Sequence, residues 1–131
     1  MSRKASRVTW IAAGATLLLL VIILAPVASS NSDPVREIRL VARDMTYYIE
    51  GQNLANPTLA VSRGERVRVR LINRDPGMTH DFSVRTWNKG TSLIVSGEQA
   101  VIEFTAPDQA GEAAYACTPH GEMMRGSIRV E

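Results

Sequence analysis

The sequence predicts an all-β domain behind one N-terminal apolar helix, and three observations predict it. Apolar and polar residues alternate over short runs through most of the chain beyond residue 34, which is the period of half-buried strands. Turns rich in Gly, Pro, Asn and Asp separate these runs, as is typical of an antiparallel sandwich or barrel. Eighteen consecutive uncharged residues, 8–25, precede them. The expected organisation is a membrane anchor or signal segment over 1–28, a linker over 29–34 and a β domain over 35–131.

The apolar run sets the expected location of the protein. It is longer than the ~7–15 apolar residues of a signal-peptide core. As a helix it would reach ~27 Å, close to the ~30 Å hydrocarbon thickness of a bilayer. The basic residues Arg3, Lys4 and Arg7 precede the run and should stay in the cytoplasm, which places the β domain on the extracytoplasmic, periplasmic side. The length favours a retained transmembrane anchor, whereas the small residues at 28–30 leave cleavage as a secreted protein open.

Strands are expected throughout the exported part. The alternation predicts them at 38–42, 59–61, 66–71, 82–84, 93–95, 101–104, 113–117 and 126–130, with one weak helical turn at 109–114. The arginines at 66, 68 and 70 alternate with apolar residues and should form the solvated face of their strand. The segment between Met45 and Pro57 fits no expected element, and Trp87 is expected to pack on the rim of the domain.

The composition excludes several classes of protein. One cysteine and two histidines in 131 residues leave no room for a disulfide framework, a paired-cysteine zinc site or a multi-histidine metal enzyme. The net charge of +2 comes from the N-terminus, because twelve basic residues face thirteen acidic ones from Asp33 onward. A nucleic-acid binder normally carries a basic surplus on its folded part, so nucleic acid is not an expected partner.

The side chains that could bind a soft metal ion, those of Cys, His and Met, lie mainly in two segments. Cys117, His120, Met123 and Met124 lie within one stretch, and His80 lies in a polar loop before the strand expected at 82–84. A thiolate, two imidazoles and a thioether form the ligand set of a mononuclear electron-transfer copper site. Singly, each residue also has a structural reading, since a lone Cys usually packs as a small buried hydrophobe and methionines fill cores. Together, on an exported all-β chain, they predict a copper site.

These residues resemble a known family. The motif Cys-Thr-Pro-His at 117–120 followed by Met-x-Gly, with His80 in its loop and Tyr115 two residues before the cysteine, is similar to the copper loop of the cupredoxins. These are the type 1 blue copper proteins, and the loop especially resembles those of plastocyanin, amicyanin and pseudoazurin. The resemblance covers residues 59–131. It implies a Greek-key β-sandwich, one copper ion that cycles between Cu(I) and Cu(II), and His80, Cys117 and His120 as equatorial ligands.

The axial ligand has two candidates. Two residues separate Met123 from His120 and three separate Met124, whereas the family has two or four. Alternation along the strand at 126–130 places Met124 on the inward face with Ile128, and Met123 on the solvent side. The Met-x-Gly register also selects Met124. The predicted metal ligands are His80, Cys117, His120 and Met124.

Two residues beside the expected ligands should tune the copper. The family often has Asn after the first histidine, whereas this chain has Asp81, whose backbone N–H can still reach the cysteine sulfur while its carboxylate adds negative charge. Pro119 removes a backbone N–H from the loop, which should make the sulfur a better electron donor. His80 leads into a strand and should lie deeper than His120, whose ring edge is expected at the surface in a mostly uncharged patch.

The leading hypothesis is an exported, membrane-tethered carrier of single electrons between redox protein partners such as a cytochrome or an oxidase, and not an enzyme. The alternative is an extracytoplasmic copper-binding or delivery protein without electron transfer. Delivery proteins favour open sites rich in Met or His, and this chain has few methionines outside the loop. Copper oxidases and nitrite reductases need additional histidines, and a dinuclear site of the oxidase-subunit kind needs a second cysteine.

Overall fold

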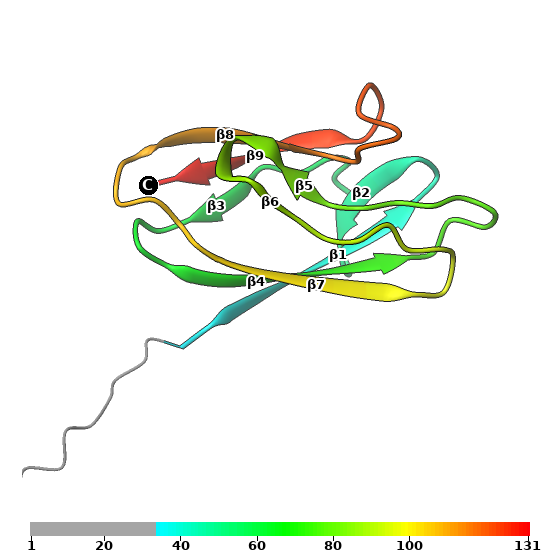
Figure 1. Ribbon diagram of the computed structural model, residues 1–131, viewed down its shortest axis with the longest axis horizontal. Helices are drawn as coiled ribbons and strands as arrows, with labels where there is room; N and C mark the ends of the chain where they lie inside the picture. Colours follow the sequence, from blue (N-terminus) through cyan, green and yellow to red (C-terminus); the bar gives the residue numbers. More distant parts are fainter. Residues whose placement is uncertain (1–33) are drawn as a thin grey trace, which may run out of the picture. The chain divides into compact units, whose positions relative to one another are not determined.

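The computed structural model describes residues 34–131 (Figure 1). The predicted anchor or signal segment, and all but the last residue of the predicted linker, lie outside these residues. Within residues 34–131, no helix has both the length and the apolar character that a membrane crossing requires.

Two β-sheets form the layers of a sandwich (Figure 1). The first contains, in spatial order, β2 (Thr46–Ile49), β1 (Arg36–Arg43), β4 (Arg66–Asn73) and β7 (Gln99–Thr105). The second contains, in spatial order, β3 (Leu59–Val61), β9 (Arg125–Val130), β8 (Gly111–Ala116), β5 (Ser83–Val84) and β6 (Lys89–Gly90). A short 3₁₀ helix, η1 (Arg85–Trp87), follows β5. The chain crosses between the sheets after β2, β3, β4, β6 and β7, and the predicted all-β sandwich is confirmed for these residues.

Strand alternation decides which residues fill the space between the sheets. The inward side chains of β1 and β4 are all less than a tenth exposed: Ile38, Leu40, Ala42, Val67, Val69 and Leu71. The arginines of β4 point to the other side, where Arg68 pairs with Glu103 and Arg70 pairs with Glu37. The arginines of β4 therefore form the expected solvated face, and they make ion pairs with residues on neighbouring strands.

Two strand pairs depart from the antiparallel pairing that is typical of the predicted sandwich. β1 runs parallel to β4, and β3 runs parallel to β9, whereas the other pairs are antiparallel. Parallel neighbours need a long crossover, and β1 reaches β4 only after the chain has passed through β2 and β3. Alternation in the sequence specifies the face that a side chain occupies, but it carries no information on the direction of the neighbouring strand.

Three local expectations also differ from the structure. Residues 93–95 form no strand, because only Ile94 is bridged, to His80, while Leu93 and Val95 are exposed. The residues expected as a helical turn at 109–114 largely belong to β8, whose burial alternates. The unplaced segment contains β2, in which Tyr47 is fully buried. Trp87 packs on Phe104 with ring centroids 5.2 Å apart, as expected.

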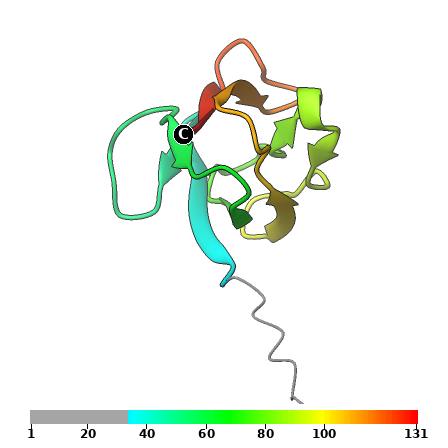
Figure 2. The ribbon, with the colours of Figure 1, turned by 90° about the vertical axis from the view of Figure 1, so that its left-hand side faces the viewer.

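The strand directions bring the candidate ligands to one end of the sandwich. β4 and β8 end there and β9 begins there, so the segments that follow β4 and connect β8 to β9 are neighbours. The opposite end holds Pro34 and the turn after β3, and there the backbone of Arg63 donates a hydrogen bond to the carbonyl of Glu131 (Figures 1 and 2). The first described residue therefore lies far from the candidate ligands.

Candidate metal centre

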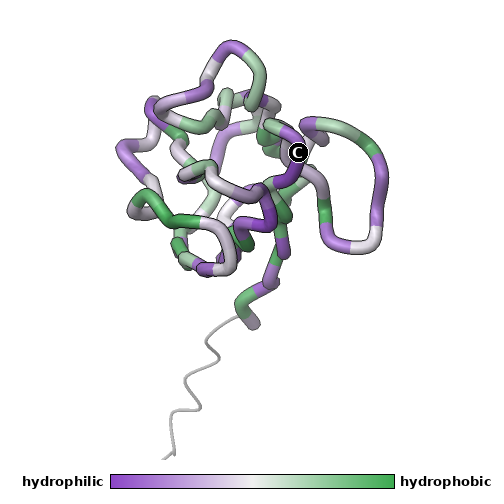
Figure 3. The backbone as a smooth tube through the Cα atoms, turned by 90° about the vertical axis from the view of Figure 1, so that its right-hand side faces the viewer, coloured by the Kyte–Doolittle hydropathy of each residue, from purple (hydrophilic) through white to green (hydrophobic). Residues whose placement is uncertain are grey.

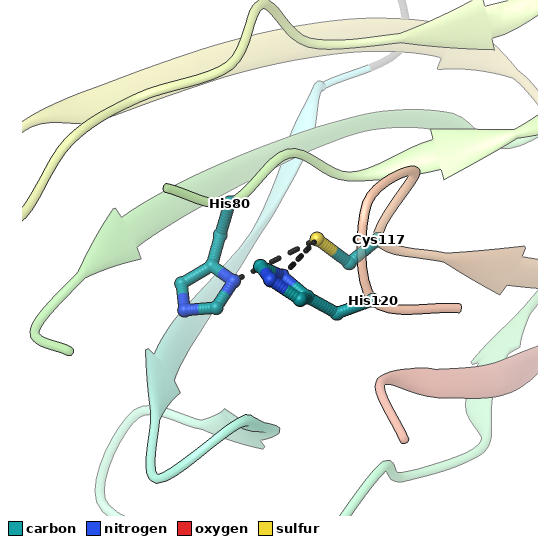
Figure 4. A group of neighbouring side chains, drawn as sticks. All are labelled: His80, Cys117 and His120. Carbon is teal, nitrogen blue, oxygen red and sulfur yellow. Dashed lines mark hydrogen bonds between the residues drawn. The ribbon is translucent and has the colours of Figure 1, made fainter. Parts of the chain in front are cut away.

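Three of the predicted ligands converge at this end of the sandwich (Figure 4). The Sγ atom of Cys117 lies 3.6 Å from Nδ1 of His80 and 3.6 Å from Nδ1 of His120. The ligand atoms of the three residues all lie within 4.8 Å of one another. In the part of the chain that the structure describes, no other group of three His, Cys, Asp or Glu side chains is arranged in this way.

The backbone holds His80 in place. Its N–H and C=O both pair with Ile94, at 3.0 and 2.9 Å. Asn73, the last residue of β4, donates from Nδ2 to the carbonyls of Met78 and Ile94, at 2.9 Å each. The loop that carries His80 is therefore closed by hydrogen bonds on both sides of the histidine.

The ring of His80 is oriented by Asp75. His80 Nε2 lies 3.0 Å from Asp75 Oδ2, and the backbone N–H of Met45 donates to the same oxygen at 2.9 Å. Burial alone would raise the pKa of Asp75, but the hydrogen bonds from Met45 and His80 outweigh it and hold this pKa below its usual value. A carboxylate can only accept, so Nε2 carries the proton and the Nδ1 lone pair faces Cys117.

The other ligands lie on the hairpin between β8 and β9. Ala116 pairs with Arg125, and the next pair along the ladder is Cys117 with Met124, joined by a 2.9 Å bond from the cysteine N–H to the methionine carbonyl. Residues directly opposite on antiparallel strands share a face, with Cβ atoms ~4.5–5.5 Å apart. The carbonyl of His120 accepts from Met124 N–H at 2.9 Å, which folds the loop back over the site.

The two methionines have opposite environments. Met124 is fully buried, whereas 59% of Met123 is exposed. The burial predicted from strand parity is therefore confirmed. It places the Met124 side chain on the same inward face as the Cys117 sulfur, and it leaves Met123 in solvent.

Asp81 ties the two ligand-bearing segments together. Its carboxylate oxygens accept from the backbone N–H and from Oγ1 of Thr118, at 2.6 Å each. Burial raises the pKa of the Cys117 thiol, the nearby charge of Asp81 adds to this, and backbone N–H donors from Asp81 and His120 oppose it. The negative charge that the sequence predicts at Asp81 therefore lies close enough to the thiol to raise its pKa.

Sequence reasoning missed a second layer of residues around the site. Asn56 donates from Nδ2 to the carbonyl of Met123 at 2.9 Å, and its Oδ1 accepts from the backbone of Tyr47. The hydroxyl of Tyr47 donates to the carbonyl of Asp81. The β-branched and aromatic run at 46–49 was an available signal for β2. Nothing in the sequence identifies Asn56.

The donor arrangement fits a metal ion of the copper or zinc size. Metal–sulfur and metal–nitrogen bonds of ~2.3 and ~2.0 Å at trigonal to tetrahedral angles set the sulfur and nitrogen roughly 3.5–3.8 Å apart. The separations of 3.6 Å satisfy this for both histidines. Both imidazole Nδ1 atoms and the thiol sulfur therefore face the same point, as the ligands of one metal ion do. Cys, two His and a weak Met donor are typical of blue copper.

Solved structures of copper proteins share this fold. Auracyanin A, a "blue" copper protein from the green thermophilic photosynthetic bacterium Chloroflexus aurantiacus, is 21% identical, with a TM-score of 0.57 over 75% of this chain and 100% of that one. Reduced auracyanin from Roseiflexus castenholzii is 16% identical, with a TM-score of 0.58 over 73% and 97%. The copper-containing nitrite reductase of Thermus scotoductus is 28% identical, with a TM-score of 0.57 over 75% of this chain but only 28% of that one.

Sequence comparison gives the family. No curated protein matches the chain significantly. The family model for copper binding proteins of the plastocyanin/azurin family matches residues 55–131, which is more than half of the chain and includes every predicted ligand. Together with the donor cluster, this makes copper the cofactor. The chain belongs to the plastocyanin/azurin family of copper binding proteins.

Proposed function

We propose that the protein is a blue copper electron carrier in which His80, Cys117, His120 and Met124 hold one copper ion. The observation that carries the proposal is the convergence of one thiol and two imidazole Nδ1 atoms within 4.8 Å. Bound copper would supply the one-electron couple between Cu(II) and Cu(I). The test is titration of Cu(II) into the copper-free protein, where an intense visible thiolate-to-copper band at one equivalent is expected.

The protein contributes a preformed and shielded set of donors. His80, Cys117 and Met124 have no exposed surface, and each is held by backbone hydrogen bonds. Donors that are fixed by the fold keep one arrangement in both oxidation states, and a dry shell controls the reduction potential. This supports electron transfer over copper delivery, which needs ligands that open. With both histidines of the chain in this cluster, no second histidine set is left for the catalytic copper of an enzyme.

Electrons are proposed to pass through His120. This residue is partly exposed, whereas His80 is fully buried. Leu93 and Val95 expose more than half of their surface on either side of Ile94, and Met123 is similarly exposed on the ligand loop. Hydrophobic stretches alternate with hydrophilic ones in the loops at this end (Figure 3). Small apolar surfaces suit the weak, transient docking of redox partners.

The membrane tether is proposed to attach at the far end of the domain. Pro34 lies beside the turn after β3, at the end opposite the candidate copper site. The predicted linker over 29–34 would therefore join the domain at the end away from His120. Attachment there leaves the surface around His120 free for partners on the periplasmic side.

The tether gives a fractionation test. We expect the full-length protein to sediment with membranes and to remain there after a high-salt wash, because an apolar span of this length inserts rather than adsorbs. A variant that lacks residues 1–28 and carries a cleavable signal is the control and should be soluble. Recovery of the native protein as a soluble species that begins near Ser30 would show a cleaved signal instead.

The axial assignment gives a second test. Met124→Leu is expected to raise the reduction potential with copper still bound, because it removes a weak donor without removing an equatorial one. The exchange conserves volume, so the free energy of unfolding should fall by less than about 1.5 kcal/mol. Met123→Leu is the matched control and should leave the potential unchanged, since Met123 is solvent-exposed. The opposite pattern in voltammetry of the two variants would make Met123 the axial ligand.

A further inference from the structure

We infer that Asp75 is a positioning residue of the copper centre, which fixes the ring of His80 and places a negative charge behind it that favours oxidised copper. The part of this inference that concerns the reduction potential rests on the proposed function. Its structural half, the hydrogen bond between the carboxylate and the imidazole, does not depend on copper.

The carboxylate of Asp75 is held in one place. Its Oδ2 atom lies 3.0 Å from His80 Nε2 and accepts from Met45 N–H at 2.9 Å. The backbone N–H of Asp75 donates to Asn73 Oδ1 at 2.9 Å, which anchors the residue to the end of β4. Asp75 is 8% exposed, so water competes little for its oxygens. The carboxylate cannot turn away from His80 without the loss of buried hydrogen bonds.

The charge of Asp75 is directed at His80. Across residues 34–131, neither Lys nor Arg forms an ion pair with Asp75, and the titratable side chain that it contacts is His80. The adjacent Arg74 pairs with Glu50 instead. The other buried carboxylate near the site, Asp81, accepts its two side-chain hydrogen bonds from Thr118 and is not hydrogen-bonded to the His80 ring. Asp75 therefore places a negative charge, without a Lys or Arg partner among the described residues, on the side of the imidazole away from the sulfur.

This arrangement has a chemical consequence for the ligand. A histidine that donates its distal N–H to a carboxylate is a more basic ligand than one that donates to a neutral carbonyl. Both the stronger donation and the negative charge stabilise Cu(II) more than Cu(I), because Cu(II) carries one more positive charge. Asp75 should therefore lower the reduction potential of the centre.

The charge is tested with Asp75→Asn in the full-length, copper-loaded protein. The amide oxygen can still accept from His80 and Met45, so this variant removes the charge while an acceptor remains. We expect the midpoint potential to shift upward. Glu103→Gln is the control, because Glu103 is an exposed carboxylate paired with Arg68 on the outer sheet face, and it should cause a much smaller shift. An Asp75→Asn potential equal to that of Glu103→Gln, or lower than that of the native protein, would overturn the proposed role of the charge.

The hydrogen bond is tested by ¹⁵N NMR of the imidazole in the copper-free, full-length protein. We expect His80 to be protonated at Nε2 in the native protein and in Asp75→Asn, with a proton that exchanges slowly with water. In Asp75→Ala this proton should exchange rapidly. An Nε2 proton equally protected in Asp75→Ala would refute the positioning role. If the native protein forms no visible copper band, the proposed function fails, and the NMR measurement still decides whether Asp75 positions His80.

Discussion

Replacing Cys117 with serine is expected to abolish the intense visible band that Cu(II) gives with the native protein. The thiolate is the charge-transfer donor, and a thiol that coordinates a metal is deprotonated outright. A hydroxyl at the same position is a harder and far more weakly acidic ligand. Because Cys117 is the only cysteine, no second thiolate can replace it. The measurement is the visible absorption spectrum during titration of each copper-free protein with Cu(II).

The fold of the Cys117→Ser variant should survive. Cys117 is fully buried, and the hydroxyl occupies nearly the same volume and can donate to Nδ1 of His80 or His120. A buried hydroxyl without a partner costs about 1–3 kcal/mol, and this partner reduces the cost. Circular dichroism and urea unfolding check this directly. A band that persists in a folded Cys117→Ser protein would show that the thiolate is not the chromophore and that the proposed centre is wrong.

The ligand-bearing strands could be predicted because strand alternation is local. Ala113, Tyr115 and Cys117 share the buried face that their spacing predicts, and Met124 lies opposite the cysteine on the continued ladder. One hairpin determines both positions, so the sequence pattern of its two strands is enough to place them. His80 was identifiable because the chain has only one histidine outside this hairpin.

The supporting residues could not be predicted because their partners are distant in the sequence. Asn56 contacts Met123, 67 residues away, and Met45 donates to Asp75 across 30 residues. Neither contact follows a period of two or of 3.6. Both depend on β2 standing beside β1 at the sheet edge, and the four residues of β2 do not alternate between apolar and polar. An Asn or Asp in such a loop looks the same in the sequence whether it faces solvent or a ligand.

Gly126→Ala is expected to destabilise the domain. Among the described glycines with ordinary backbone angles, which are Gly90, Gly111, Gly121 and Gly126, this substitution should have the largest effect. A Cβ at this position would lie 2.4 Å from Oη and 2.5 Å from Cζ of Tyr115, and 2.9 Å from the carbonyl oxygen of Asn56. The tyrosine cannot withdraw, because it is fully buried and its hydroxyl donates to Pro57 at 2.6 Å. Its ring also stacks on Phe82 with centroids 5.0 Å apart. Such overpacking costs about 1–3 kcal/mol or more.

Urea unfolding measures this loss in the free energy of unfolding, with Gly111→Ala as the control variant. Gly111 lies on the adjacent strand β8 and has open space around the same added atom, so its substitution should change the free energy of unfolding little. Adding Tyr115→Phe to Gly126→Ala removes the contact with Oη but leaves Cζ at 2.5 Å, so it should restore only part of the lost stability. The added methyl group should displace β9 locally. Because Gly126 is two residues from Met124, this displacement should also change the copper spectrum. Equal stability of the two glycine variants would show that Tyr115 does not pack against β9 as the structure has it.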